Sequence, residues 1–237
     1  MSFFKKVFGN NNQNTTEHKR FKEGDIFYTI KVGKPSVYKL LVIDKEFDTF
    51  HVLCYNDAEG VPKLSQVNDL GVKIYHFPVA SNGFDKPILI ANQKVSDEDL
   101  IGYFSYIKQT SNAKEIVKYA KHYYDIALQL TNQKNYKEAI FSYEKAIELM
   151  PNFFEAIDNR AFCMMDLGRW DEAIAGFIQS LEVNPNSLLA TFSIGECYFN
   201  SKRYREAKPY FEKASLIDPT HPKPKEFLDS TLRLLNG

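Results

Sequence analysis

Leu181-Glu182-Val183-Asn184-Pro185 is the stretch that decides the fold of the second half of this chain, because it recurs along the sequence. Its proline stands midway between Pro151 and Pro219, so that the three prolines are equally spaced. The residues before the other two prolines are similar, with Ile147-Glu148-Leu149-Met150 in one place and Leu216-Ile217-Asp218 in the other. A fixed period of this length predicts a helix-turn-helix unit copied in tandem, with the copies stacked on one another.

The positions between these prolines repeat in the same register. With each proline at unit position 32, the units begin at Ala120, Phe154 and Leu188. Small residues, which let two helices approach closely, recur at positions 8 and 20, and large aromatics recur at positions 17 and 24. In this order of positions they are Ala127, Ala161 and Gly195; Ala139, Ala173 and Ala207; Tyr136, Trp170 and Tyr204; and Tyr143, Phe177 and Phe211.

This pattern resembles the tetratricopeptide repeat and covers about residues 120–219. The resemblance implies three units, 120–153, 154–187 and 188–221, each made of a helix A and a helix B. Lys225–Leu235 is amphipathic and is expected to cap the exposed end of the stack, as solenoids require. The departures from the family pattern are Ser180 at position 27 and, at position 4, Tyr123, Ile157 and Thr191.

The first half of the chain has a different pattern, in which short β-branched and aromatic runs alternate with Gly, Pro, Asp and Asn. Such runs predict strands, here at about 26–30, 37–43, 50–55, 72–79 and 88–91. Their close spacing predicts a small antiparallel barrel, and the Gly24-Asp25 opening resembles an SH3-like or Tudor-like barrel. Because the runs are apolar on both faces, both faces must be covered, by a following helix, by the repeats or by a partner.

We therefore expect an α+β protein in four parts. Residues 1–20 are predicted to be a flexible N-terminal segment, 21–95 a β-rich SH3-like module, 96–119 connecting helices, and 120–237 the repeats with their capping helix. Ser96-Asp97-Glu98-Asp99 predicts the start of a helix that runs to about Lys108, since an N-cap and acids favour the first turn. Ser111-Asn112 predicts the cap of a second helix that continues into helix A of the first unit.

Composition indicates an ordinary soluble protein. Of 237 residues, 44% are hydrophobic and 25% charged, and the formal net charge is zero. A protein that neutralises many phosphates usually has a basic domain, so nucleic acid is disfavoured as a partner. The apolar cluster Phe3-Phe4-Lys5-Lys6-Val7-Phe8 is too short for a membrane span, and we interpret it as a frayed or back-packed terminus, with insertion into a membrane interface as the alternative. We expect a cytoplasmic protein.

No motif for catalysis or for a cofactor stands out. The sequence has no GxSxG, no Gly-rich phosphate loop and no HExxH. Cys54, Cys163 and Cys197 have no CxxC spacing and are expected to be small buried residues, without a metal or a disulfide. The five histidines are scattered, and an enzyme site would have to gather distant residues such as His51, His76 and Asp25. We therefore expect a protein that is not an enzyme and needs no cofactor and no metal.

The resemblance implies that positions 2, 5, 9, 12 and 13 of helix A line a concave groove that binds protein. Positions 2, 5, 9 and 12 share one helix face. The protein-binding residues predicted in this way are Lys121, Tyr124, Leu128, Glu155, Asp158, Phe162, Met165, Phe192, Glu196 and Phe199. Thr131, Asn132, Asp166, Leu189 and Asn200 occupy the remaining positions. Carboxylates beside apolar side chains predict a protein or peptide partner of basic and apolar character.

Family members that grip the C-terminal carboxylate of chaperones do so with Lys, Asn and Arg. Here the corresponding places hold Tyr124, Leu128, Leu189 and Ser193, and only Asn159 matches. The resemblance therefore disfavours a chaperone tail as the ligand.

The most favoured function is non-catalytic protein binding through the groove. The overall design is similar to bacterial two-domain repeat proteins, some of which are antitoxin-like immunity proteins that act by stoichiometric occlusion. The alternatives are a self-associating scaffold or assembly adaptor, with a homo-oligomer as the expected form, and an enzyme with an unrecognised site. Two further interpretations stay open for the groove itself. Its aromatics are packed inside the stack or covered by the N-terminal domain, or residues 3–8 of the chain occupy it.

Overall fold

The computed structural model describes residues 21–31 and 33–236, and the chain divides after Thr110 into two compact units. Unit 1 ends at Thr110 and unit 2 begins at Ser111. The predictions made for residues 1–20 lie outside the described residues. Within the described ranges, every helix is too short or too polar to span a lipid bilayer.

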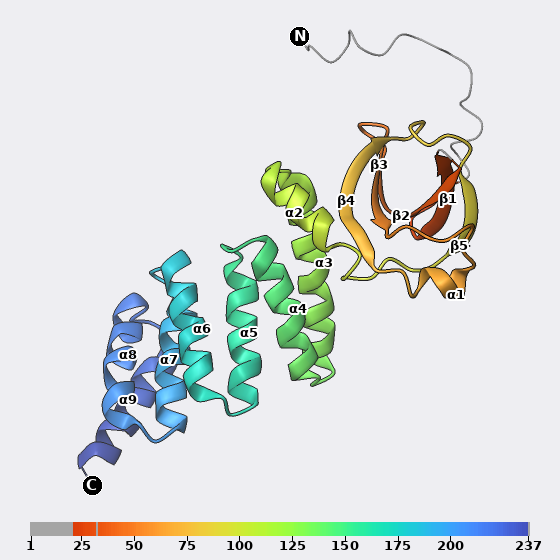
Figure 1. Cartoon of the computed structure of the whole chain (residues 1–237). Coiled ribbons are helices and arrows are strands. Elements are labelled where there is room, and N and C mark those ends of the chain that lie inside the picture. The colour runs from red at the N-terminus through yellow and green to blue at the C-terminus, as the bar shows by residue number, and fades with distance from the viewer. Residues whose placement is uncertain (1–20, 32, 237) are drawn as a thin grey trace, which may run out of the picture. The chain divides into compact units, whose positions relative to one another are not determined.

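Among its described residues, unit 1 contains a five-stranded antiparallel sheet that curls on itself (Figure 1). The strand order is β4-β3-β2-β1-β5, with bounds β1 Asp25–Lys31, β2 Lys34–Asp44, β3 Thr49–Tyr55, β4 Val72–Ala80 and β5 Ile88–Asn92. The register shifts at several places, such as between Leu40 and Val42, and extra residues of this kind bend a strand. The predicted antiparallel, β-rich first domain is therefore confirmed, and its resemblance to an SH3-like or Tudor-like barrel stays a prediction.

Both faces of the central strands β1 and β2 are apolar and covered. Phe27, Tyr38 and Leu40 belong to a buried cluster on one face, against which Phe84 packs. Ile26 and Val37, their neighbours in sequence, belong to a second cluster on the other face. The short helix α1 (Leu64–Val67) covers that second face through Leu64 and Val67. The apolar faces of the strands need to be covered, and part of this cover comes from α1, which the strand pattern alone did not predict.

The predicted helix at residues 96–108 is present but begins later. Helix α2 spans Ile101–Gln109, and residues 97–100 form turns. Ser96 nevertheless caps this turn as expected, since its Oγ accepts a hydrogen bond from Asp99 N while the Asp99 carboxylate accepts one from Ser96 N. The Asp99 carboxylate also forms an ion pair with Lys39 on β2, with Nζ and Oδ2 2.7 Å apart. Because Lys39 is buried, this contact fixes the turn before α2 to the sheet.

Helix α2 packs tightly on β4. A methyl group at Gly102 would lie 2.7 Å from the carbonyl carbon of Tyr75, so only glycine permits this approach. Beneath the helix, His51 Nδ1 and His76 Nε2 lie 2.9 Å apart and form a hydrogen bond. One of the two nitrogens carries a hydrogen and donates this bond, and the other accepts it. The rings of Tyr103 and Tyr106 pack against this pair at 4.9 Å from His51 and 4.7 Å from His76. Burial, and secondly the neighbouring His51, lowers the pKa of His76 to about 4.

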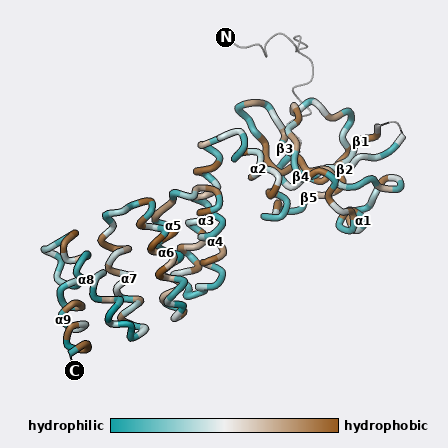
Figure 2. Tube along the Cα trace, turned by 60° about the vertical axis from the view of Figure 1, so that its left-hand side comes forward, coloured by the Kyte–Doolittle hydropathy of each residue, from teal (hydrophilic) through white to brown (hydrophobic). Residues whose placement is uncertain are grey.

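Unit 2 is a stack of helix pairs followed by a last helix (Figure 1). The pairs are α3 (Ala113–Asn132) with α4 (Tyr136–Leu149), α5 (Phe154–Asp166) with α6 (Trp170–Val183), and α7 (Leu188–Asn200) with α8 (Tyr204–Ile217). Helix α9 (Pro222–Asn236) then packs on α8. Figure 2 shows hydrophobic positions recurring along α3–α9 between hydrophilic ones, as expected of helices that bury one side. The predicted solenoid with a capping helix is confirmed.

Helix α3 is longer than the other A helices. It begins at Ala113, and the Asn112 side chain accepts a hydrogen bond from Glu115 N as its cap. Residues 96–119, expected to connect the two parts, therefore separate into α2, which packs on β4 of unit 1, and the first turns of α3 in unit 2.

The repeated small positions and the aromatics at position 24 form the core of the stack, whereas the aromatics at position 17 are half-buried. Ala127, Ala161, Ala139, Ala173 and Ala207 are fully buried. The aromatics at position 24, Tyr143, Phe177 and Phe211, are also fully buried. Gly195 replaces alanine in the third unit because a methyl group there would lie 2.6 Å from Cε1 of Phe211.

We predict that Gly195→Ala destabilises unit 2 by about 1–3 kcal/mol, the usual effect of adding a methyl group to a filled core. Trp170, the one tryptophan of the chain, lies in α6 and reports unfolding of this unit by its fluorescence in urea. The second-site change Phe211→Leu should recover part of the loss in Gly195→Ala, because it makes room for the methyl group. Equal stability of Gly195→Ala and wild type would contradict this account of the glycine.

We also predict that the stability of unit 1 depends on the protonation of His76. Its folded pKa lies below its ordinary value of 6.5, so the unfolded state binds more protons between about pH 6.5 and pH 4. The neutral ring contributes fully above pH 6.5, and this contribution is lost as the pH falls toward 4. We expect a loss of about 1–2 kcal/mol, reduced because the ring is only half-buried.

Hydrogen exchange of the β4 amides at pH 7 and pH 4.5 measures this loss. His76→Gln removes the titrating ring and should be less sensitive to pH, whereas His122→Gln, on the exposed side of α3, should behave as wild type. The same pH dependence in wild type and His76→Gln would show that other groups cause it.

Candidate functional site

The predicted binding residues lie on the A helices α3, α5 and α7, and we call the surface formed by these residues the A-helix surface. Lys121 and Glu155 are exposed. Asp158 is buried. Tyr124, Leu128, Phe162, Met165, Phe192, Glu196 and Phe199 are half-buried. The remaining positions are exposed except for Thr131, whose hydroxyl donates to the Ala127 carbonyl oxygen within α3.

The aromatics of the third unit are packed inside the stack. Phe227 of α9 lies 5.3 Å from Phe192, 5.4 Å from Phe199 and 5.3 Å from Phe211, measured between ring centres. Phe192 also contacts Phe211 of α8 at 5.6 Å. These contacts favour the interpretation that Phe192 and Phe199 contribute mainly to packing, and that α9 covers them.

The second unit contributes two half-buried apolar residues, Phe162 and Met165. Phe162 packs edge-on against Phe177 at 5.0 Å and keeps part of its ring exposed. Met165, one turn further along α5, is likewise half-buried. Partly exposed aromatic and thioether side chains make large contacts that adapt to a ligand. Helix α5 therefore contributes apolar contact area to the A-helix surface close to its carboxylates.

Tyr124 and Asn159 join the first unit to the second. Asn159 Nδ2 donates a hydrogen bond to Tyr124 Oη at 3.0 Å, and the Tyr124 ring packs against Phe153 at 4.8 Å. Burial, together with the nearby charge of Glu155, raises the pKa of the Tyr124 hydroxyl, so it stays neutral. The asparagine that matched a carboxylate-binding position is thus already engaged by the chain itself.

Asp158 is a buried carboxylate with little compensation. Its residue is only 6% exposed, and Oδ1 has no hydrogen-bond partner among the described residues. Burial raises the pKa of Asp158, and the charge of Glu155 adds to this shift. The Ser180 hydroxyl lies near enough to oppose the shift, yet it makes no hydrogen bond of normal geometry. The free protein therefore holds a carboxylate in a place that disfavours its charge.

Glu196 differs from Asp158 because a cation is near. Burial raises the pKa of Glu196, but Lys223 at the start of α9 opposes the shift. The acidic residues at the start of α6 are paired as well, since Glu172 contacts Arg169 and Asp171 contacts Arg203. Within the described residues, no ion pair reaches Glu155 or Asp158, which makes α5 the acidic part of the A-helix surface.

The residues considered for an enzyme site do not form one. Asp25 accepts hydrogen bonds from Lys22 N and Asn92 Nδ2, so it fixes the start of β1. His51 and His76 form the pair beneath α2, although no sequence motif links these two histidines. Across the described part of the chain, no group of three or more His, Cys, Asp or Glu could hold a metal ion. Cys163 and Cys197 are buried, which raises the pKa of both thiols, that of Cys197 to about 12.

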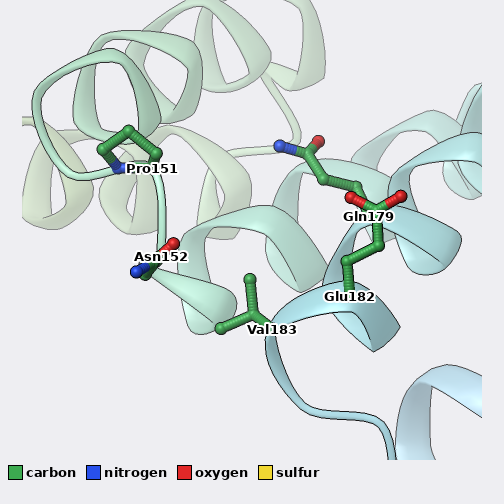
Figure 3. Close-up of a pocket in the computed structure, with 5 residues that line it drawn as sticks. All are labelled: Pro151, Asn152, Gln179, Glu182 and Val183. Carbon is green, nitrogen blue, oxygen red and sulfur yellow. The ribbon is translucent and has the colours of Figure 1, made fainter.

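A shallow hollow lies elsewhere in unit 2, between the turn after α4 and the end of α6. Pro151, Asn152, Gln179, Glu182 and Val183 line it (Figure 3). Gln179 accepts a hydrogen bond from Arg160, and Glu182 is the one carboxylate among the five lining residues. The hollow offers no paired acid and base, so it does not resemble a catalytic site.

Comparisons with known proteins agree with the repeat pattern. A family model described as anaphase-promoting complex, cyclosome, subunit 3 matches residues 132–214. Small glutamine-rich tetratricopeptide repeat-containing protein 2 of Mycosarcoma maydis is 34% identical over 104 residues, which are 44% of this chain and 30% of that protein. Hsp70-Hsp90 organizing protein 3 of Arabidopsis thaliana is 31% identical over 101 residues, 43% of this chain and 18% of the other.

Among solved structures, the first TPR of Spaghetti (RPAP3) bound to the HSP90 peptide SRMEEVD is similar to this chain. It has a TM-score of 0.49 and 21% identity, and the overlay covers 51% of this chain and 96% of that one. This chain spans less than a third of the length of the two curated relatives above. The helix pairs, the residues in register at each unit and the family match together identify the helical part of this chain as a tetratricopeptide repeat domain.

Proposed function

We propose that this chain is a non-catalytic protein-binding protein whose A-helix surface holds a segment of another protein. The observation that carries the proposal is the surface of α5, where the uncompensated Glu155 and Asp158 lie on the same helix face as the half-buried Phe162 and Met165. Apolar contact provides affinity, and charge decides which partners are accepted. The partner is therefore a protein or peptide segment with both apolar and basic side chains.

The charge of this surface argues against an acidic ligand. The HSP90 peptide named in the similar structure contains two glutamates and a final aspartate. A ligand of that kind would meet Glu155 and Asp158, and like charges brought together at an interface weaken binding. Although a relative is named as an organizer of Hsp70 and Hsp90, we propose a different class of partner for this chain.

A narrower form of the proposal is an antitoxin-like immunity role in the bacterial cytoplasm. In that role the A-helix surface would cover the active surface of a basic toxin in a one-to-one complex. This form is supported by the acidic character of α5 and by the two-unit architecture.

Self-association as a scaffold or adaptor is the second candidate, and one observation favours it. The edge strands β4 and β5 expose Ile74, Tyr75, Ile88 and Leu89, each at 44–50%. Edge strands with exposed apolar side chains can pair with another chain. Light scattering of the purified protein distinguishes a monomer from such an assembly.

We predict that Glu155→Lys lowers the recovery of the natural partner at least about ten-fold, because it places a like charge opposite the basic ligand. The measurement is quantitative affinity capture from native extract with the full chain as bait. Phe141→Ser is the matched control, since Phe141 is 56% exposed on the B helix α4. Phe192 is unsuitable as a test position because its ring is packed on Phe227. Loss of the partner with Phe141→Ser but not with Glu155→Lys would move the binding site off the A-helix surface.

A further inference from the structure

We propose that Asp158 selects a lysine or arginine side chain of the bound segment. Without this cation the buried carboxylate lowers the stability of the free protein, and the bound cation compensates its charge. The inference rests on the proposed function, because it names the residue that gives the A-helix surface its preference for a basic partner.

The first observation is the incomplete environment of Asp158. Its Oδ1 is buried without a hydrogen-bond partner among the residues described, and so is Ser180 Oγ beside it. A buried carboxylate normally has a cation or several hydrogen-bond donors around it. Such an unsatisfied group in a native structure calls for a physical explanation, and a ligand that supplies the missing cation provides one.

The second observation comes from the repeat itself. In the first step of the stack, position 5 of one unit contacts position 6 of the next, because Asn159 Nδ2 donates to Tyr124 Oη. The same step leads from Asp158 to Ser193, which are position 5 of the second unit and position 6 of the third. Ser193 is buried, and its Oγ lacks a partner within the described residues. The hydrogen bond between adjacent units is thus present between the first and second units. Between the second and third units, Asp158 Oδ1 and Ser193 Oγ remain without a partner among the described residues.

No cation of the described chain offsets the charge of Asp158. Arg160 lies two residues away, which places it on another side of α5, and its guanidinium donates to Gln179 and is influenced by Glu144. Lys223 acts on Glu196 instead. Glu155, one turn before Asp158, adds negative charge at the exposed end of this surface. A serine hydroxyl can donate one hydrogen bond but cannot neutralise a charge, so the complement that fits is a cationic side chain.

The apolar neighbours define the rest of the ligand. Phe162 and Met165 follow Asp158 along the same face of α5 and keep part of their surface exposed. A segment that reaches both places would carry its basic residue three or four positions from an apolar one. The stem of lysine or arginine is itself apolar and suits a partly buried site.

Proton linkage gives a signature of this role. Burial raises the pKa of Asp158 above its ordinary value of 3.8 in the free protein, so folding favours the protonated form. The stability contribution of the protonated group is present below pH 3.8 and is lost as the pH rises through the raised pKa. A bound cation favours the charged carboxylate, and affinity for a basic ligand should therefore rise over the same pH range.

The test is a synthetic array of ten-residue peptides that carry leucine at alternating positions and, at each other position in turn, lysine, arginine, acetyl-lysine or glutamate. We expect the full wild-type chain to prefer lysine or arginine over acetyl-lysine at one position by about 30-fold, the size expected for a buried charge pair. Asp158→Asn should lose this preference and keep the weaker apolar binding. Asp171→Asn is the matched control, since Asp171 is exposed and pairs with Arg203.

Two further measurements keep the test decisive. Asp158→Asn should unfold at the same or a higher temperature than wild type at pH 7.5, because it removes the buried charge. If the variant does not fold, the wild-type affinity for the selected lysine peptide, measured by fluorescence polarisation in steps from pH 3.8 to pH 7.5, should still rise as the pH passes above the ordinary pKa of an aspartate. The acetyl-lysine twin of that peptide should show no such rise.

The outcomes separate this inference from the proposed function. Equal binding of lysine and acetyl-lysine peptides, or an unchanged preference in Asp158→Asn, overturns the selection by Asp158 and leaves protein binding by the A-helix surface intact. Binding of no array peptide also overturns the inference, and the capture experiment with Glu155→Lys then judges the proposed function by itself. A peptide of this chain's own residues 2–10 that binds more tightly than every array peptide would replace the external partner by the chain's own terminus.

Discussion

The close approach of helix A to helix B in each unit is the constraint on which the rest of unit 2 depends. It requires fully buried small residues at positions 8 and 20, such as Ala161 and Ala173. The fit allows little change, because a methyl group at Gly176 would lie 2.9 Å from Cβ of Ala161. One side of each A helix packs against its B helix. The side that carries positions 2, 5, 9 and 12 therefore forms a surface. Residues at the same position of successive units thus become neighbours on it.

The sequence was informative where contacts are local and repeated. The helix pairs, the packing aromatics and the capping helix follow from the spacing of the three prolines, because each unit touches mainly its neighbours. The alternation of apolar residues likewise predicted the five strands of unit 1. Features that depend on one distant contact were not predictable. The attachment of the turn before α2 to the sheet depends on Lys39, which is far from Asp99 in the sequence. The histidine pair depends on the register of β3 against β4 and on the docking of α2.

For the candidate binding residues, too, local position was predictable from the sequence and distant contacts were not. The resemblance to the repeat family implied that all ten lie on the A helices, but it could not tell which of them other side chains would cover. Phe192 and Phe199 share a face with Phe162, yet a single residue of α9, Phe227, packs against both. Charge compensation was equally hidden, since Glu196 has Lys223 nearby whereas Asp158 has no cation among the described residues. Sequence spacing locates a surface, and packing at the end of the stack decides how much of it a ligand can reach.

Phe227 also has a consequence for how a chain of this kind can change in evolution. Its ring lies where α7 and α8 would otherwise meet the first helix of another unit, and it contacts three phenylalanines at once. A duplicated unit placed directly after α8 would have to reproduce this three-way contact, or leave Phe192, Phe199 and Phe211 against a surface that does not fit them. A duplication placed before α7 would leave this three-way contact intact. A change in the number of units therefore disturbs the packing of α7, α8 and α9 least when it falls before α7.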